Sequence, residues 1–142
     1  MTHRVVVIDD DADVRELIGK VLVRAGHEVL SASTGEAGLA LFDLHEVHCA
    51  VVDKLLPQMN GLEVLAAVRT RFPKVPVVLV TAHPEPFNLE AERPDVVLAK
   101  PFKNLKAIED AVKEALDGVV VEKSALTNFK ERVVAVVRRK RE

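Results

Sequence analysis

The sequence predicts an α/β fold in which one five-stranded parallel sheet carries helices on both faces, followed by an extra C-terminal helix. Two observations support this fold class. Short apolar runs alternate with segments whose apolar residues recur at helical spacing, as in βα units. The strand runs also lack period-2 alternation, which is typical of strands covered on both faces. A chain of 142 residues suits one such domain, expected at 1–118, with 119–142 as an extension.

The first βα unit begins with a predicted strand at Val5–Ile8. A helix should follow, because apolar residues then recur at i, i+3, i+4, i+7 and i+8. This stripe consists of Val14, Leu17, Ile18, Val21 and Leu22. Asp11 or Asp13 can cap the first turn by accepting backbone N–H bonds. Gly26 stands where a helix end favours a left-handed residue.

The next two strands are predicted near Glu28–Ala32 and at Cys49–Val52, the latter ending at Asp53. Between them, a helix should start after Thr34 and Gly35. A lone cysteine can form neither an internal disulfide nor a cysteine metal site. We therefore interpret Cys49 as a core residue.

Proline sets the limits of the later elements. The third helix must stop before Pro73, because the residue that precedes proline is disfavoured in the helical region. Strands are expected at Val77–Val80 and Val96–Ala99, and the last regular helix should end before Gly118. Three prolines between these strands leave room for at most a short helix, from about Phe87 to Arg93.

Composition excludes several classes of protein. With 49% hydrophobic and 30% charged residues, the chain is typical of a soluble globular domain. Its apolar runs are too short to cross a bilayer, and no signal peptide follows Met1, so a cytoplasmic location is expected. The net charge is −2 although the C-terminal end is basic, so the preceding chain is acidic. An acidic main domain argues against a nucleic-acid surface there. The histidines lack ligand spacing and are expected at the surface; they are His3, His27, His45, His48 and His83.

Polar residues follow four of the predicted strands. These residues are Asp9, Asp10, Asp53, Thr81 and Lys100. They should meet in one crevice, because ligands of open parallel sheets bind beyond the carboxyl ends of the strands. Three adjacent carboxylates repel one another unless a hard cation such as Mg²⁺ lies among them. With a lysine and a hydroxyl beside them, they suit phosphoryl chemistry.

Four stretches carry a family resemblance. They read VVVIDDD from Val5, CAVVDKLLPQMNG from Cys49, VVLVTA from Val77 and VLAKPF from Val97. In this order and spacing they resemble the receiver domain of two-component response regulators, over roughly Arg4 to Leu116. The resemblance implies a flavodoxin-like, doubly wound sheet with strand order 2-1-3-4-5.

The resemblance also implies a metal site. By analogy with the family, Asp10 would bind Mg²⁺ directly and Asp9 would bind it through water. Asp53 and the backbone carbonyl of Leu55 would complete the protein ligands.

The same resemblance assigns the phosphoryl group to Asp53 as acceptor. Thr81 would grip the transferred group and Lys100 would pair with it. In the family the Lys-Pro peptide is cis, and Pro101 stands at that position. Taken singly, Thr81 is an ordinary strand-end threonine and Lys100 an ordinary surface lysine. Asp9, Asp10 and Asp11 could simply cap a helix, so the assignment depends on the whole set.

Two departures from the family pattern bear on output. Val97 occupies the position, three before Lys100, at which the family usually has an aromatic residue. The segment from Thr81 to Lys100 is shorter than usual, so we predict that phosphorylation does not drive the common fourth-helix dimer. Leu55 and His83 would flank the path of the hydrolytic water, and an apolar Leu55 is predicted to slow dephosphorylation.

The predicted function is a signalling switch whose only chemistry is gain and loss of its own acyl phosphate, rather than an enzyme. A sensor histidine kinase or a histidine phosphotransfer protein would supply the phosphoryl group. The output would be a protein target that the sequence does not identify, and a homodimer stays open. Direct DNA binding is not expected, because the tail is too short for such a domain.

Two alternatives remain at this point. Asp9, Asp11, Thr81 and Lys100 stand in the order seen in haloacid-dehalogenase-like phosphatases, although the required later acidic pair is lacking. The other alternative is a pseudo-receiver that binds partners without phosphate.

The C-terminal extension has its own pattern. Its apolar residues form a helical stripe that ends in basic residues; the stripe consists of Leu126, Phe129, Val133, Val136 and Val137. We expect an amphipathic helix that either packs on the domain or its twin, or contacts a partner or an anionic surface.

Overall fold

The computed structural model describes residues 2–82 and 94–118. These residues form five strands and four helices: β1 (Arg4–Ile8), α1 (Ala12–Arg24), β2 (Glu28–Ala32), α2 (Gly35–Leu44), β3 (Cys49–Asp53), α3 (Gly61–Arg71), β4 (Val77–Thr81), β5 (Val96–Ala99) and α4 (Leu105–Asp117). All five strands were predicted within one residue of these bounds. The short helix expected near Phe87–Arg93 and the extension 119–142 lie outside the described residues.

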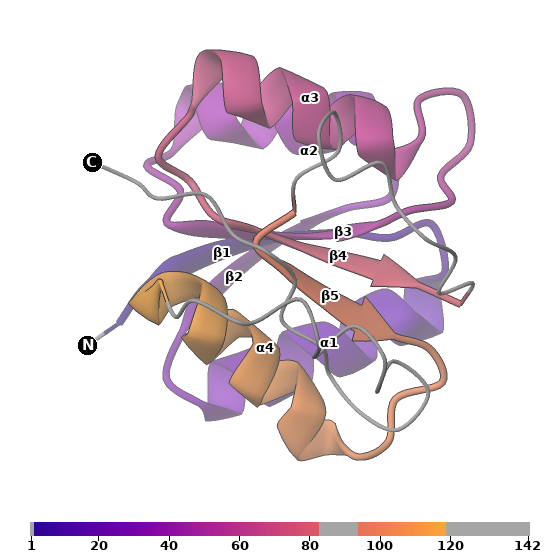
Figure 1. Cartoon of the computed structure of the whole chain (residues 1–142), viewed down its shortest axis with the longest axis vertical. Coiled ribbons are helices and arrows are strands. Elements are labelled where there is room, and N and C mark those ends of the chain that lie inside the picture. The colour runs from indigo at the N-terminus through magenta and orange to yellow at the C-terminus, as the bar shows by residue number, and fades with distance from the viewer. Residues whose placement is uncertain (1, 83–93, 119–142) are drawn as a thin grey trace.

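The strands form one parallel sheet in the order β2-β1-β3-β4-β5, which confirms the predicted topology. Helices α1 and α4 cover one face, and α2 and α3 cover the other (Figure 1). Val7 of β1 lies in register with Ser31 of β2 and with Val51 of β3. All the strands are parallel, so their carboxyl ends meet at one edge of the sheet, to which the arrowheads of β4 and β5 point (Figure 1).

The core has two halves, one on each face of the sheet. Alternate side chains of a strand point to opposite faces, so Val5 and Val7 pack with Ile108 of α4 while Val6 and Ile8 pack with α2 and α3. Cys49 is fully buried, as expected. Valine predominates in the three central strands because β-branched side chains suit strands buried on both faces.

Capping residues set the helix ends. Asp11 caps α1 by accepting hydrogen bonds from the backbone N–H groups of Asp13 and Val14, so of the two predicted caps it is Asp11 that acts. Thr34 caps α2 by accepting a hydrogen bond from the backbone N–H of Ala37, and the helix begins at Gly35, one residue earlier than expected. Helix α4 ends at Gly118, whose φ of 71° is left-handed, a conformation that glycine adopts without strain.

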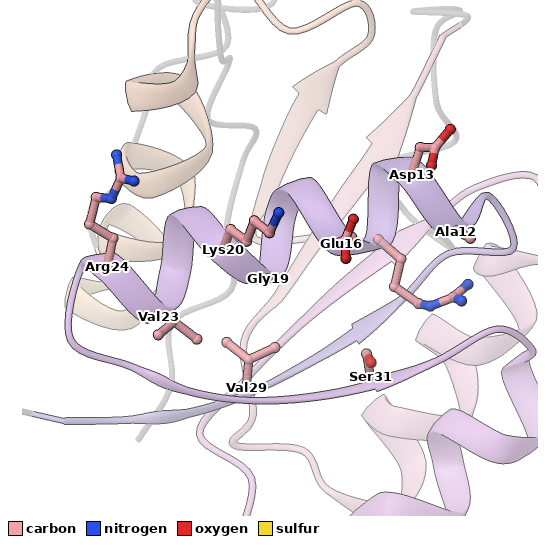
Figure 2. Close-up of a pocket in the computed structure, with 10 residues that line it drawn as sticks. Ala12, Asp13, Glu16, Gly19, Lys20, Val23, Arg24, Val29 and Ser31 are labelled. Carbon is pink, nitrogen blue, oxygen red and sulfur yellow. The ribbon is translucent and has the colours of Figure 1, made fainter.

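The expectation that all strands are covered on both faces is wrong for β2. This strand lies at the edge of the sheet, and only Ala32 of its five residues is buried. A groove of about 900 Å³ runs between β2 and α1, where Val29 and Ser31 face Gly19 and Val23 (Figure 2). The groove leaves this face of β2 open to solvent, whereas the other edge strand, β5, is buried along most of its length.

The expectation that the histidines are surface residues is wrong for three of them. His3, His27 and His48 directly precede β1, β2 and β3, are half-buried, and pack ring against ring at the amino edge of the sheet. His45 is exposed, as predicted. His83 lies outside the described residues. Within the described ranges, no helix is long and apolar enough to cross a membrane.

Candidate functional site

Four strands deliver the predicted site residues to the carboxyl edge of the sheet. Asp9 directly follows β1, Asp53 is the last residue of β3, and Thr81 is the last residue of β4. Lys100 directly follows β5, and its backbone N–H donates a hydrogen bond to the carbonyl of Thr81. The parallel register therefore gathers residues that are distant in the sequence, as predicted.

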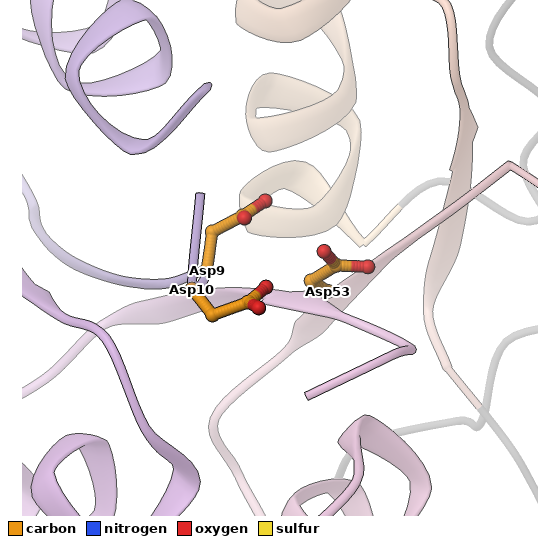
Figure 3. A group of neighbouring side chains, drawn as sticks. All are labelled: Asp9, Asp10 and Asp53. Atoms are coloured by element: carbon orange, nitrogen blue, oxygen red, sulfur yellow. The ribbon is translucent and has the colours of Figure 1, made fainter. Parts of the chain in front are cut away.

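Three carboxylates form the centre of this edge. Asp9, Asp10 and Asp53 each offer an oxygen, and these oxygens lie within 4.8 Å of one another. Figure 3 shows the three side chains converging on a common space from β1 and β3. Asp9 is 1% exposed and Asp53 is 7% exposed, whereas Asp10 is open to solvent. The cluster thus has a buried wall and an open mouth.

Lys100 neutralises part of this charge. Its Nζ donates hydrogen bonds to Oδ2 of Asp53 at 3.1 Å and to Oδ2 of Asp9 at 3.3 Å. Thr81 is 1% exposed at the adjacent strand end. Lys100, the expected cation of the site, is therefore in direct contact with Asp53, the expected acceptor.

Burial and mutual repulsion act on the ionisation of the cluster. Burial, followed by the negative charge of Asp53, raises the pKa of Asp9, although the N–H of Asp11 and the charge of Lys100 oppose the change. Burial alone would lower the pKa of Lys100, but the hydrogen bond and charge of Asp53 outweigh it and raise that pKa. Lys100 therefore stays protonated, and a second cation would relieve the repulsion that remains.

The donor set fits Mg²⁺. This ion prefers oxygen ligands and keeps several waters, so the protein supplies only part of its coordination sphere. Three carboxylate oxygens beside an open mouth meet those requirements. Asp9, Asp10 and Asp53 are the residues that could hold it.

Backbone N–H groups orient two of the carboxylates. The N–H of Asp11 donates to Oδ1 of Asp9 at 2.9 Å, and the N–H of Leu55 donates to Oδ1 of Asp53 at 3.2 Å. In each case the donor lies two residues after the acceptor, the pattern of an Asx turn. Each Oδ1 is thereby fixed, while Oδ2 remains directed to Lys100.

Sequence reasoning missed two residues that shape this site. Arg15 of α1 donates a hydrogen bond from Nη1 to the backbone carbonyl of Asp9 at 2.7 Å. Gly61 leaves no room for a side chain, because a Cβ there would lie 2.2 Å from the backbone oxygen of Asp53. Gly61 was visible within the motif that starts at Cys49, but no pattern indicated Arg15, whose contact depends on how the loop folds back.

The departures from the family pattern are located as follows. Val97 is fully buried within β5. Leu55, two residues after Asp53, is 61% exposed. The peptide bond between Lys100 and Pro101 is cis, as the resemblance implied.

Known proteins match this chain over most of the described residues. The sequence model of the response regulator receiver domain matches residues 5–113. The response regulator protein FleR of Pseudomonas aeruginosa is 30% identical over 119 residues, which make up 82% of this chain and 25% of FleR. The chain therefore spans about a quarter of that relative's length.

Solved structures agree with this assignment. The chemotaxis response regulator CheY4 of Vibrio cholerae superposes with a TM-score of 0.75 at 25% identity, covering 82% of this chain and all of CheY4. The BeF3-activated receiver domain of DrrB gives a TM-score of 0.69 at 27% identity, covering 82% of this chain and 99% of that domain. With the family match over residues 5–113, these likenesses show that the chain belongs to the response regulator receiver domain family.

Proposed function

We propose that this receiver domain is a phosphoacceptor switch in which Asp53 accepts the phosphoryl group. The observation that carries the proposal is the contact of Lys100 with both Asp53 and Asp9, within a cluster of three carboxylates. A cation fixed beside a nucleophilic carboxylate stabilises the charge that develops on a transferring phosphoryl group. The receiver-family membership of the chain supports the same role.

The transfer is an in-line displacement. An Oδ atom of Asp53 attacks the phosphorus of a phosphorylated histidine, the phosphorus–nitrogen bond breaks, and its electron pair stays on the departing imidazole, which takes up a proton. Lys100 pairs with an oxygen of the transferred group, and the Thr81 hydroxyl donates to another. When bound by Asp9, Asp10, Asp53 and the Leu55 carbonyl, Mg²⁺ would supply further positive charge to the same oxygens. The product is an acyl phosphate on Asp53, which water later hydrolyses to carboxylate and phosphate.

The proposed phosphodonor is a sensor histidine kinase or a histidine phosphotransfer protein. The state of Asp53 would then alter the affinity for a downstream protein by changing the loops around the site. The family match gives no support to the haloacid-dehalogenase-like alternative. A pseudo-receiver would keep the fold without the chemistry, and the complete set of acids speaks against it.

We assign the switch to residues 1–118 and treat residues 119–142 as a separate extension. The sequence between Thr81 and Lys100 lacks part of the helix that receiver domains usually have between their fourth and fifth strands. Phosphorylation is therefore not expected to drive the dimer that commonly forms through that helix. Analytical ultracentrifugation of the phosphorylated chain, followed by mapping of its contacts, tests this point. A dimer formed through that surface would contradict it.

Labelling of the full chain with a small phosphodonor tests the proposed acceptor. In the presence of Mg²⁺, intact-mass spectrometry should reveal one added phosphoryl group, and peptide mapping should locate it on Asp53. The label should be absent without Mg²⁺ and absent in Asp53→Asn.

Asp13→Asn is the matched control, because Asp13 is an exposed aspartate in the first turn of α1. It should take up the label as the wild type does. Labelling that persists in Asp53→Asn, or turnover of phosphomonoesters through Asp9, would contradict the proposal.

A further inference from the structure

A row of imidazole rings occupies the amino edge of the sheet, at the opposite end of the strands from the acidic cluster. His3 and His27 hold equivalent positions, because each precedes the residue with which β1 and β2 begin their pairing, Arg4 with Glu28. Their ring centroids are 5.9 Å apart. His48 packs edge-on against His3 at 5.5 Å.

The three rings differ in their hydrogen bonds. Nδ1 of His48 accepts a hydrogen bond from the backbone N–H of Arg4 at 2.8 Å. Nδ1 of His3 and Nδ1 of His27 are buried, and neither has a hydrogen-bond partner in the described part of the chain. Two buried polar atoms without partners in one small cluster are unusual in a folded protein. His48 is therefore committed to the backbone, whereas His3 and His27 remain available to a ligand.

A carboxylate faces the same two rings. His3, His27 and Glu109 line one cavity of about 270 Å³ between the amino edge of the sheet and α4. The neighbouring Asp117 is engaged by Lys113 at 2.9 Å. The carboxylate of Glu109 makes no hydrogen bond or ion pair with residues 2–82 or 94–118. The cavity is thus lined by two imidazoles whose Nδ1 atoms make no hydrogen bond, and by one carboxylate that makes no hydrogen bond or ion pair, within this part of the chain.

We propose that His3, His27 and Glu109 form a binding site for a divalent transition-metal ion such as Zn²⁺. Imidazole nitrogen and carboxylate oxygen are the ligands that this ion commonly takes in proteins, at about 2.0–2.2 Å. Two imidazoles on one tetrahedral ion have ring centroids roughly 5 Å apart at those bond lengths. The observed separation of 5.9 Å is close to that value.

Binding requires the three side chains to rearrange. Among the described residues, only the acidic cluster already holds three ligand atoms within 4.8 Å of one another, so His3, His27 and Glu109 must draw together around the ion. Burial, followed by the charge of His3, lowers the pKa of His27 and keeps its ring neutral near pH 7. A neutral ring is the form that binds a metal.

Calorimetric titration of the full chain with ZnCl₂, carried out without an affinity tag, tests the proposal. An Asp10→Asn background and excess Mg²⁺ remove competition from the acidic cluster. One equivalent of Zn²⁺ should bind, and His27→Gln and Glu109→Gln should each weaken binding at least about tenfold, the scale on which loss of a supporting group already reduces affinity. His45→Gln, which removes an exposed histidine outside the cluster, should leave binding unchanged.

A second readout separates ligation from folding. Co²⁺ should give the visible absorption of an ion with nitrogen and oxygen ligands in the wild type, and this signal should be lost in Glu109→Gln even though that variant keeps the wild-type circular dichroism. Absence of Zn²⁺ binding in the Asp10→Asn background would overturn the proposal. Equal affinity of the Glu109→Gln and His27→Gln variants with the wild type would overturn it as well. Neither result bears on the phosphoacceptor role of Asp53, which does not depend on this site.

Discussion

Lys100 is the side chain on which the charge balance of the acidic cluster depends. It contacts Asp53 and Asp9 simultaneously, and its raised pKa reflects those two contacts. A bound Mg²⁺ would be a second cation beside the same carboxylates. Removal of the Lys100 ammonium group should therefore slow phosphoryl transfer but tighten Mg²⁺ binding.

Lys100→Gln tests this opposition. Loss of the ammonium should slow phosphorylation of Asp53 by roughly 100-fold, the usual effect of removing one charge-stabilising donor. The same change should tighten Mg²⁺ binding, because a competing cation is gone. Rates of labelling and magnesium titrations measure the two effects. Lys103→Gln is the control: it removes an exposed lysine and should change neither the labelling rate nor Mg²⁺ binding. If Lys100→Gln weakened Mg²⁺ binding as well as slowing phosphorylation, the prediction would be contradicted.

His27 should make stability depend on pH. Burial and the charge of His3 lower the pKa of His27, while Glu109 opposes them. The unfolded chain then binds more protons than the folded chain just below pH 6.5 or so, the ordinary pKa of histidine. Stability should therefore rise with pH through this window and fall on acidification. Urea unfolding at a series of pH values measures the slope, which His27→Gln should reduce and His45→Gln should retain.

At the scale of elements, the apolar runs were sufficient to predict the strands. The runs at Val77–Val80 and Val96–Ala99 are short and apolar throughout, as is typical of strands covered on both faces. Proline and glycine marked the helix ends. The acid cluster was predictable because its members lie at, or within two residues of, the carboxyl ends of β1 and β3. Arg15 and the histidine row were not, because the first depends on loop conformation and the second on the register between β1, β2 and β3.

The loop between β3 and α3 depends on Gly61. Gly61→Ala should destabilise the fold by about 1–3 kcal/mol, as overpacking usually does, because the added Cβ would meet the backbone of Asp53 and Lys54. Displacement of Asp53 should also reduce its labelling. Gly19→Ala is the matched control: its Cβ would lie 3.7 Å from Val29, and alanine is favoured within a helix. Thermal unfolding compares the two variants, and equal stabilities would count against a close approach at Gly61.

At the scale of the whole molecule, the sheet joins two chemically different edges. The carboxyl edge gathers acids from β1 and β3, and the amino edge gathers histidines that precede β1, β2 and β3. Ions bound at either edge would stabilise the same fold, because both sites consist of residues brought together only by the complete sheet.

Mg²⁺ should therefore raise the thermal stability of the chain. At a concentration about 100 times its dissociation constant, a ligand specific for the folded state adds about 2.7 kcal/mol. Differential scanning calorimetry with and without Mg²⁺ measures the shift in Tm. Asp10→Asn should abolish most of it and Asp13→Asn should not. A shift that is unaffected by Asp10→Asn would place the ion elsewhere.

The ion pair between Lys100 and Asp9 joins residues 91 positions apart in the sequence. A chain that ended before β5 would contain Asp53 but would lack the cation that contacts both aspartates. We expect such a truncated chain to take up the phosphoryl label poorly.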